Sequence, residues 1–348
     1  MNIENVRLIG RVMPLDDTLW MALSGTGTEC SVTGTYTKIT LVADDTWSGV
    51  PENRVRVAVY VDGERVVDTL LSEPETTVTA FETDCRETHV IRVIKLSESA
   101  MSTCGIAGIE TDGTVVPTKP NVRFIEFIGD SITCGYGVDD EDRDHHFATG
   151  TEDVTRAYAY KTAEALKADY SMVSFSGYGI VSGYTATGEK VANQLVPEYY
   201  EKLGFSYGTY KGEYKPQDAA WDFSKQQPDF VVINLGTNDM SYVLDQDDRR
   251  EEYISGYITF LKTVRKNNKT AQILCVLGMM GEALCPALKA AVDRYRAETG
   301  DTKVSYMGFP DQLPEDGYAA NWHPTETTHT KAATKLTEEI KKCYEDKL

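Results

Sequence analysis

The hydrophobic pattern of this chain changes at one short segment that contains two prolines, Val116-Pro117-Thr118-Lys119-Pro120. Before it, short runs alternate apolar and polar residues between turn residues, which is typical of β-strands. After it, apolar runs of strand length alternate with segments of helical periodicity, which indicates a parallel sheet covered by helices. The 348 residues suffice for two hydrophobic cores. We therefore predict two domains, residues 1–115 and 121–348, joined by a stiff linker.

The clearest strand of the first domain is predicted over residues 54–61, where every second residue is a valine. Asp62-Gly63 then predicts a hairpin turn, and residues 64–67 begin the return strand. Further strands are expected over residues 38–43, 76–81, 89–96 and 105–109. Short strands with regular turn signals predict an all-β domain, either a β-sandwich or a jelly roll.

The second domain alternates predicted strands and helices. The strands are expected over residues 124–128, 171–175, 230–235, 271–278 and 304–307. Helices are expected over 156–168, along the face formed by Tyr253, Tyr257, Leu261 and Val264, between Pro286 and Gly300, and over 326–344, where Leu336 and Ile340 face the core. This order predicts a doubly wound, flavodoxin-like, three-layer α/β/α domain with its site at the carboxyl ends of the strands.

Charge excludes some classes of partner. The net charge of −19 makes nucleic acid and anionic membrane surfaces poor partners, whereas a neutral glycan fits such a surface. No apolar run approaches the length needed to span a bilayer. The seven cysteines are odd in number and show no CxxC spacing, and the first residues lack the pattern of a secretory leader. We expect a cytoplasmic protein, although a secreted protein whose leader has been removed would show the same pattern.

Three short motifs in the second domain suit ester cleavage. Gly129-Asp130-Ser131 follows the first predicted strand, Gly236-Thr237-Asn238-Asp239 follows the third, and Trp322-His323-Pro324 precedes the last helix. A serine hydroxyl becomes an effective nucleophile when a base removes its proton and donors stabilise the oxyanion. We expect Ser131 to be this nucleophile; the alternative is a serine that only caps the following turn.

The candidate oxyanion donors lie in two further turns. Asn238 offers a side-chain amide, and removing one such donor costs ~3–4 kcal/mol of transition-state stabilisation in other hydrolases. Gly177 and Gly179, at the end of the second predicted strand, each offer a backbone N–H, and the sequence favours neither. The N–H of Ser131 would be the third donor. Each of these residues has an ordinary role in a turn as its alternative.

Only five histidines are available as the base, and His323 is the preferred one. His89 falls in the β domain, and a packed or solvated role is expected for His329 near the start of the last helix. His145 and His146 lie in an acidic loop that offers a weak alternative as a metal site, because no helical or paired ligand spacing supports it. We expect no metal and no cofactor.

In these motifs the chain resembles the SGNH (GDSL-type) hydrolase superfamily and, more narrowly, carbohydrate esterase family 2. The resemblance rests on residues 129–137, 176–179, 221–223, 228–229, 231–239, 323–324 and 329. That family joins an amino-terminal jelly roll to an SGNH domain and removes acetyl groups from plant saccharides such as xylan and glucomannan, often at the 6-hydroxyl. It implies that Ser131 is the nucleophile, that His323 is the base, and that Gly177 and Asn238 belong to the oxyanion hole.

The chain departs from the wider superfamily three positions before His323. An aspartate is typical there, but this chain has Ala320. In a Ser-His-Asp triad the acid holds the imidazole tautomer, and its loss can reduce turnover by ~10⁴-fold. Some members of family 2 also lack this acid and use a backbone carbonyl. We predict a Ser-His dyad in which a carbonyl of residues 317–321 holds His323, with Glu315 or Asp316 as the alternative.

Three functions are compatible with these motifs. The first is an esterase that removes O-acetyl groups from xylo- or manno-oligosaccharides, and the second is a transacetylase in which a sugar hydroxyl replaces water. The third is a carbohydrate-binding protein whose site has lost its activity. Aromatic residues could form a platform for the sugar, although a place in the core is their commoner role. The candidates are Trp221, Trp322, Tyr178, Tyr136 and Tyr184.

Overall fold

The structure is a computed structural model that describes residues 5–345. The outer ends of both predicted domains, at residues 1–4 and 346–348, therefore lie outside the described residues, as does part of the amino-terminal stretch examined for a leader.

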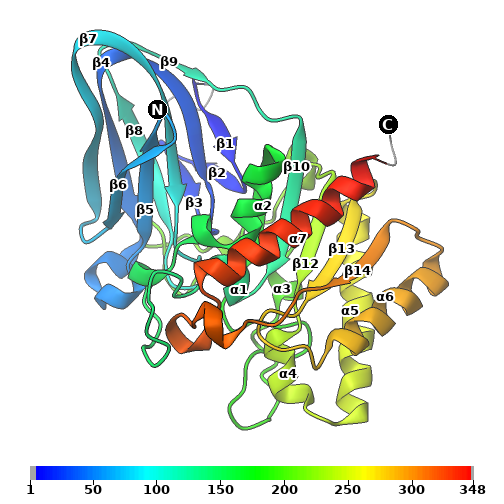
Figure 1. The fold of residues 1–348 in the computed structure, drawn as a ribbon. Helices are drawn as coiled ribbons and strands as arrows, with labels where there is room; N and C mark the ends of the chain where they lie inside the picture. Colours follow the sequence, from blue (N-terminus) through cyan, green and yellow to red (C-terminus); the bar gives the residue numbers. More distant parts are fainter. Residues whose placement is uncertain (1–4, 346–348) are drawn as a thin grey trace.

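Within residues 5–345, the amino-terminal domain is a nine-stranded antiparallel sheet. Its strands are β1 (Arg7–Ile9), β2 (Val12–Leu15), β3 (Thr18–Met21), β4 (Gly27–Ala43), β5 (Arg56–Val61), β6 (Glu64–Leu70), β7 (Glu75–Lys95), β8 (Cys104–Glu110) and β9 (Thr114–Pro117). Neighbouring strands follow the order β2-β3-β8-β4-β7-β5-β6, with β1 and β9 paired to β4. The sheet curls around an apolar core of its own (Figure 1). The predicted all-β domain is confirmed.

The long strands β4 and β7 differ from the expected short strands. They pair from Gly27↔Ile94 to Val42↔Glu75, with irregularities near Gly34 and Thr37. The sequence predicted two strands within β7, separated by the polar residues 82–88. The strand continues through these residues although most of their side chains are exposed. It pairs with β4 at Glu82 and again at Glu87 and Thr88, and the register shift between these pairs skips residues 83–86. The predicted hairpin turn is present, because Asp62 and Gly63 both have positive φ angles, 52° and 90°.

The second domain contains five parallel strands in the order β11-β10-β12-β13-β14 within the described residues. They are β10 (Arg123–Gly129), β11 (Ala168–Ser174), β12 (Phe230–Asn234), β13 (Gln272–Leu277) and β14 (Val304–Gly308). The helices are α1 (Ser131–Cys134), α2 (Tyr158–Leu166), α3 (Val196–Tyr199), α4 (Thr237–Val243), α5 (Asp247–Asn267), α6 (Cys285–Thr299) and α7 (Glu326–Glu345). Helices α2 and α7 cover one face of the sheet, and α5 and α6 cover the other (Figure 1). This confirms the predicted doubly wound α/β/α domain.

Some predicted boundaries shift. The helix expected over residues 156–168 is α2, which ends before Lys167, a residue in the left-handed conformation. Ala168 opens β11 because it pairs with Arg123 in the sheet, and this pairing overrides the helix preference of alanine. Helix α6 contains a proline in its first turn and ends at Thr299, with Gly300 just past its end, as predicted. Leu336 and Ile340 of α7 are fully buried, also as predicted.

The topology brings three strand ends together. The chain leaves β10 for β11 on one side of the sheet and later enters β12 on the other side, so β10 is flanked by both. In open parallel sheets, ligands bind at the carboxyl ends of the strands where the strand order reverses in this way. The segments after β10, β11 and β12 contain Ser131, Gly177 and Asn238.

A buried cation joins the two domains. Arg11 lies between β1 and β2, is fully buried, and contacts Glu126 of β10 through an Nη2–Oε1 distance of 2.9 Å. Its other terminal nitrogen donates to the carbonyls of Tyr200 and Lys202. These contacts tie the β domain to β10 of the parallel sheet and to the segment that follows α3.

Candidate active site

The predicted site residues meet in one cavity of about 680 Å³ at the carboxyl ends of the parallel strands. It is lined by Ser131, Tyr136, Ser176, Gly177, Tyr184, Thr237, Asn238, Met240, Ser241, Leu244, Met280, Asn321, Trp322 and His323. The lining combines residues that follow four strands, β10, β11, β12 and β13, with the loop before α7. The structure thus brings together Ser131, Gly177, Asn238 and His323, which the sequence had placed in four separate segments.

Ser131 and His323 form a hydrogen-bonded pair. The distance between Ser131 Oγ and His323 Nε2 is 2.9 Å, so the hydroxyl donates to the imidazole when that nitrogen is unprotonated. Ser131 is only 5% exposed and is the first residue of α1. The side chain of Asp130 caps this helix by accepting the N–H of Ile132 at 3.0 Å. A serine with a histidine acceptor at this distance has the geometry of an activated nucleophile.

The imidazole of His323 is held without a carboxylate. Its Nδ1 lies 3.1 Å from the carbonyl oxygen of Ala320, and the ring stacks on Tyr136 with centroids 3.9 Å apart. A carbonyl oxygen can only accept a hydrogen bond, so Nδ1 carries the hydrogen. Nε2 is then unprotonated and accepts the hydrogen bond from the Ser131 hydroxyl. Burial lowers the pKa of His323 to about 4. The histidine is therefore neutral near pH 7 and ready to take a proton.

The loop before His323 has an unusual backbone. Asn321 and Trp322 are consecutive non-glycine residues with φ angles of 51° and 62°. Non-glycine residues are uncommon at positive φ angles, because this conformation is strained. Where it occurs, it is often found at functional sites. The Asn321 side chain donates to the hydroxyl of Tyr136 at 2.6 Å, and this bond ties the strained loop to the ring that stacks on His323. This conformation lets the Ala320 carbonyl face the imidazole.

The two acidic alternatives for holding His323 are placed elsewhere. The Asp316 carboxylate pairs with Lys331 at 2.7 Å, and Glu315 is exposed. At the superfamily's usual position, the side chain of Ala320 is fully buried. A Cβ added to Gly137 would lie 2.7 Å from the Ala320 Cβ, so this contact is tight. The structure thus assigns the supporting contact to the Ala320 carbonyl, within the predicted loop.

The side chain of Asn238 is oriented by the backbone next to the cavity. Its amide nitrogen donates to the carbonyl of Tyr178 at 2.9 Å and lies 3.4 Å from the Asp130 carboxylate. An amide nitrogen has two hydrogens, and the contact with Asp130 is long for a hydrogen bond. One N–H is therefore fixed, while the other can serve an oxygen atom in the cavity.

The structure separates the two glycines that the sequence left open. Gly177 lines the cavity and has a φ of 82°, and a Cβ added to it would meet nothing closer than 4.0 Å. Gly179 donates its N–H to the Gln194 carbonyl at 3.1 Å, and a Cβ there would overlap the carbonyl of Ser182. Gly179 therefore serves packing, and the geometry favours Gly177 as the donor.

Two of the predicted sugar-binding aromatics do not reach the cavity. Tyr178 is 1% exposed, and its ring packs in the core beside Phe175. Trp221 packs instead near Trp20, below the guanidinium of Arg11 at 5.4 Å. These two predictions are wrong because each ring has an apolar or cationic partner inside the protein.

The other three aromatic candidates do line the cavity. Trp322 and Tyr184 are 47% and 60% exposed, so their faces are open to solvent, whereas Tyr136 is buried against His323. Exposed rings beside a polar site are well suited to contact the apolar face of a sugar. The cavity also contains Met240, Leu244 and Met280, for which the sequence gave no signal.

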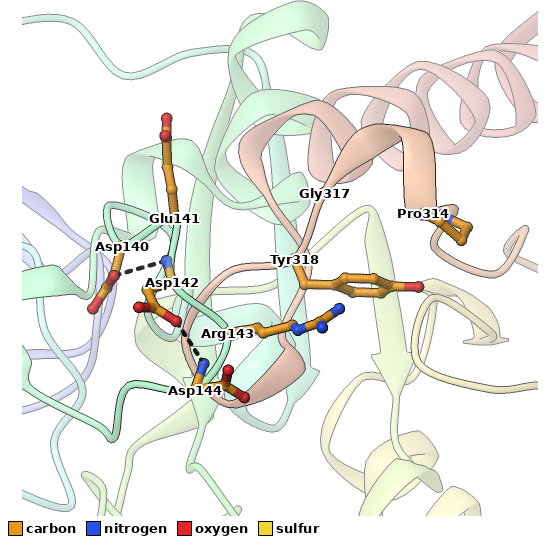
Figure 2. A pocket seen from close by; sticks show the side chains of 8 residues that line it. All are labelled: Asp140, Glu141, Asp142, Arg143, Asp144, Pro314, Gly317 and Tyr318. Atoms are coloured by element: carbon orange, nitrogen blue, oxygen red, sulfur yellow. Dashed lines mark hydrogen bonds between the residues drawn. The ribbon is translucent and has the colours of Figure 1, made fainter.

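The acidic loop after Ser131 forms a neighbouring hollow of about 690 Å³. Its lining is Asp140, Glu141, Asp142, Arg143, Asp144, Pro314, Gly317 and Tyr318, and Figure 2 shows Arg143 and Tyr318 extending the same way. The guanidinium of Arg143 lies 4.2 Å from the ring of Trp322, which links the two hollows. Asp140 accepts from His145 Nδ1 at 3.0 Å and raises the pKa of that histidine. The loop thus borders the cavity.

Asp239 is a site-supporting residue whose role the sequence did not reveal. Its buried carboxylate accepts the N–H groups of Ile180, Val181 and Ser182 at 2.8–3.1 Å, which orders the loop that follows Gly177. Burial raises the pKa of Asp239 to about 6 and, together with the charge of Asp239, raises the pKa of Asp130 to about 7. The extended GTND motif was the available signal, since its last residue has no role in the predicted chemistry.

Potential metal ligands cluster at a different place from the one considered in the sequence. Among residues 5–345, the side chains close enough to share an ion are Glu98, Cys134 and Glu152, and His145 and His146 do not belong to such a group. For the part of the chain that the structure describes, every helix is too short or too polar to cross a membrane.

Comparisons with known proteins agree with this geometry. Residues 127–331 match the GDSL-like Lipase/Acylhydrolase family, and residues 8–120 match the Carbohydrate esterase 2 N-terminal family. The cellulase/esterase CelE of Acetivibrio thermocellus is 30% identical over 327 residues, which are 92% of this chain and 37% of that protein. An acetylxylan esterase / glucomannan deacetylase of Cellvibrio japonicus is 27% identical over 292 residues, which are 82% of this chain and 75% of that protein.

Solved structures show the same two-domain arrangement. A family two carbohydrate esterase from Clostridium thermocellum, in complex with cellohexaose, has a TM-score of 0.85 at 28% identity and covers 97% of this chain and 99% of that one. An acetyl xylan esterase from the rumen bacterium Butyrivibrio proteoclasticus has a TM-score of 0.88 at 25% identity, with coverage of 99% and 96%. The chain therefore belongs to the GDSL-like lipase/acylhydrolase family and, within it, to the carbohydrate esterases of family 2.

Proposed function

We propose that this chain is a serine esterase that removes O-acetyl groups from plant-derived saccharides, with acetylated xylo- and manno-oligosaccharides as substrates. The observation that carries the proposal is the 2.9 Å contact between Ser131 Oγ and a neutral, oriented His323 at the base of an open cavity. The names of two relatives, an acetylxylan esterase / glucomannan deacetylase and an acetyl xylan esterase, support this class of substrate.

The first half of the reaction acylates Ser131. Its oxygen attacks the acetyl carbonyl carbon while His323 Nε2 takes the hydroxyl proton. The carbonyl oxygen becomes an oxyanion that accepts from Asn238 Nδ2 and from the N–H groups of Gly177 and Ser131. When the tetrahedral intermediate collapses, the bond to the sugar oxygen breaks. His323 returns its proton to that oxygen, which leaves as a sugar hydroxyl.

The second half releases acetate. His323 removes a proton from a water molecule, whose oxygen attacks the acetyl-serine carbonyl and forms a second oxyanion in the same hole. Collapse breaks the bond to Ser131 Oγ, which recovers its proton from His323. Proton transfer and electrostatic stabilisation are provided by residues of the cavity, and the same steps with a sugar hydroxyl in place of water would transfer the acetyl group.

The shape of the cavity supports a preference for 6-O-acetyl groups. Ser131 is only 5% exposed, so an ester must reach down to it. An acetyl group on a primary C6 hydroxyl stands one carbon further from the sugar ring than an acetyl group on a ring hydroxyl. The ring can then rest against Trp322 or Tyr184 at the mouth, since both are largely exposed and line the cavity.

Acetate release from acetylated xylo- and manno-oligosaccharides tests this proposal. We expect release by the wild type and by Ser305→Ala, an exposed serine of β14 remote from the cavity, and none by Ser131→Ala. Chelator should leave the rate unchanged, and NMR of partly deacetylated mannan should show loss of 6-O-acetyl signals first. Glycan binding by a wild type that releases no acetate would contradict the proposal and support a binding protein.

A further inference from the structure

A pair of buried carboxyl groups lies between the two domains and has no part in the reaction described above. Glu98 follows β7 of the amino-terminal domain, and Glu152 belongs to the segment between α1 and α2. Both side chains are fully buried. One oxygen of each and the sulfur of Cys134 lie within 4.8 Å of one another. Burying a carboxyl group costs free energy unless hydrogen bonds or an ion pair offset the loss of water.

Glu98 holds the turn that carries the proposed oxyanion donor. Its Oε2 accepts the backbone N–H of Ser176 at 2.8 Å, and Ser176 immediately precedes Gly177. The N–H of Tyr178 donates to the carbonyl of Phe175, so Ser176 and Gly177 are the central residues of a β-turn. Gly177 is the third residue of this turn and has a positive φ angle, so the turn is of type II.

The orientation of this turn is not secured by local packing. A β-turn of this kind can change type when its central peptide rotates, and the central peptide here carries the Gly177 N–H. Gly177 has no side chain, and a Cβ added to it would find no atom closer than 4.0 Å. On one side of Gly177, its carbonyl accepts a hydrogen bond from the backbone N–H of Tyr184 at 2.8 Å. The Glu98 bond restrains the other side.

Glu98 is itself rigidly held. Its backbone N–H donates to Glu152 Oε2 at 2.7 Å, and its carbonyl accepts from Lys95 Nζ at 2.9 Å. Lys95 is fully buried and also donates to the carbonyl of Ser97. Both backbone groups of Glu98 are therefore anchored, so its side chain offers a fixed acceptor to the catalytic domain.

The chemistry of the cluster favours this positioning role over a metal site. Burial raises the pKa of Cys134 well above its ordinary value, so the thiol keeps its proton and is a poor ligand. Burial also raises the pKa of Glu98 and of Glu152, whose pKa the neighbouring Glu98 raises further. Both shifts favour the protonated, neutral form of the carboxyl groups over the ionised form that binds a metal.

We propose that Glu98 is a positioning residue by which the amino-terminal β domain sets the orientation of the Gly177 N–H in the oxyanion hole. This inference rests on the proposed esterase function. It gives the β domain a direct part in turnover, in addition to any part in substrate binding. Complete loss of one oxyanion donor lowers kcat by about 10²–10³-fold. A donor that is misplaced but still present should cost less, about 10–100-fold in kcat.

Three substitutions at Glu98 test this role. Glu98→Met fills the space but leaves the Ser176 N–H without an acceptor, and we expect kcat to fall about 10–100-fold with KM within about threefold of the wild-type value. Glu98→Ala should act in the same direction. Glu98→Gln keeps an amide oxygen for Ser176 and should retain kcat within about threefold. The affinity for a boronic acid, which forms a tetrahedral adduct with Ser131, should fall in parallel with kcat.

Glu126→Gln provides the matched control. Glu126 is a buried carboxyl group at the same domain boundary and pairs with Arg11, but it makes no contact with the turn. This variant should lose thermal stability and keep its kcat per folded molecule. If Glu98→Met kept the wild-type kcat and boronate affinity, the inference would be overturned. It would also be overturned if Glu98→Gln lost as much kcat as Glu98→Met. A wild type without esterase activity would overturn the proposed function itself, and this inference with it.

Discussion

The two halves of the candidate active site are held in place by different means. Ser131, Gly177 and Asn238 each follow a strand of one parallel sheet, so the hydrogen-bonded register of β10, β11 and β12 sets their spacing. His323 follows a loop instead, and that loop contains two consecutive residues in the left-handed conformation. The sheet half is fixed by many backbone bonds, whereas the histidine half depends on a few contacts and on stored strain.

The histidine half lacks the support that a carboxylate usually gives to a catalytic histidine. A carboxylate partner would hold an imidazole by a strong, charged hydrogen bond. Here a neutral carbonyl and an aromatic stack replace it, with an Nδ1–O distance of 3.1 Å to Ala320 and a centroid distance of 3.9 Å to Tyr136.

The largest effect is expected where the two halves meet. Ser131→Ala and His323→Ala should each reduce kcat by about 10⁴–10⁶-fold, because nucleophile and base act as a unit. The double variant should be no slower than the slower single variant. Acetate release under saturating substrate measures this, and additive losses in the double variant would mean that the two residues do not cooperate.

A smaller effect is expected within the sheet half. Asn238→Ala removes one oxyanion donor and should lower kcat by about 10²–10³-fold with little change in KM. The matched control is Ser241→Ala, which removes a hydroxyl from the same helix and the same cavity but takes no donor from the oxyanion. If Asn238→Ala raised KM and left kcat unchanged, Asn238 would bind the ground state of the substrate.

Substitution in the histidine half should act mainly on stability. Ala320→Asp restores the residue typical of the superfamily, but the Ala320 side chain is fully buried against Gly137. Overpacking costs about 1–3 kcal/mol, and an unpaired buried carboxylate adds to that. We expect a lower melting temperature and no gain in kcat. A strong gain in activity would show that the carbonyl of Ala320 is not the effective support, with Ala320→Ser as the smaller polar control.

Much of the fold could be predicted because its signals are local and periodic. The strands of the parallel sheet are apolar runs, and α6 has a proline at its start and Gly300 at its end. The long strand β7 was divided in the prediction because residues 82–88 are mostly polar, whereas pairing with β4 at Glu82 and again at Glu87 and Thr88 joins its two parts. That pairing joins segments distant in sequence, so no local pattern contains it.

The candidate site shows the same limit. Motifs pointed to Ser131, Asn238 and His323 because the side chains themselves carry the chemistry. The support of His323 comes from a backbone carbonyl, which any residue type provides, so the sequence could only name the loop. Tyr178 and Trp221 were misplaced because an aromatic ring has the same pattern in a core as in a sugar site. Glu98 was missed because its partner Ser176 belongs to the other domain.

The smallest effect, and a direct test of the histidine half, is expected from a change in pH. Burial lowers the pKa of His323 to about 4, and the base acts only when it is neutral. The value of kcat/KM should therefore rise as pH increases through about 4, with no inflection at 6.5, the ordinary value for histidine. Asp130 also borders the site, with a pKa raised by burial to about 7, so Asp130→Asn is the necessary control. An inflection near 6.5 in both proteins would mean that the imidazole is fully solvated, and that the stack on Tyr136 and the bond to Ala320 do not hold it in place.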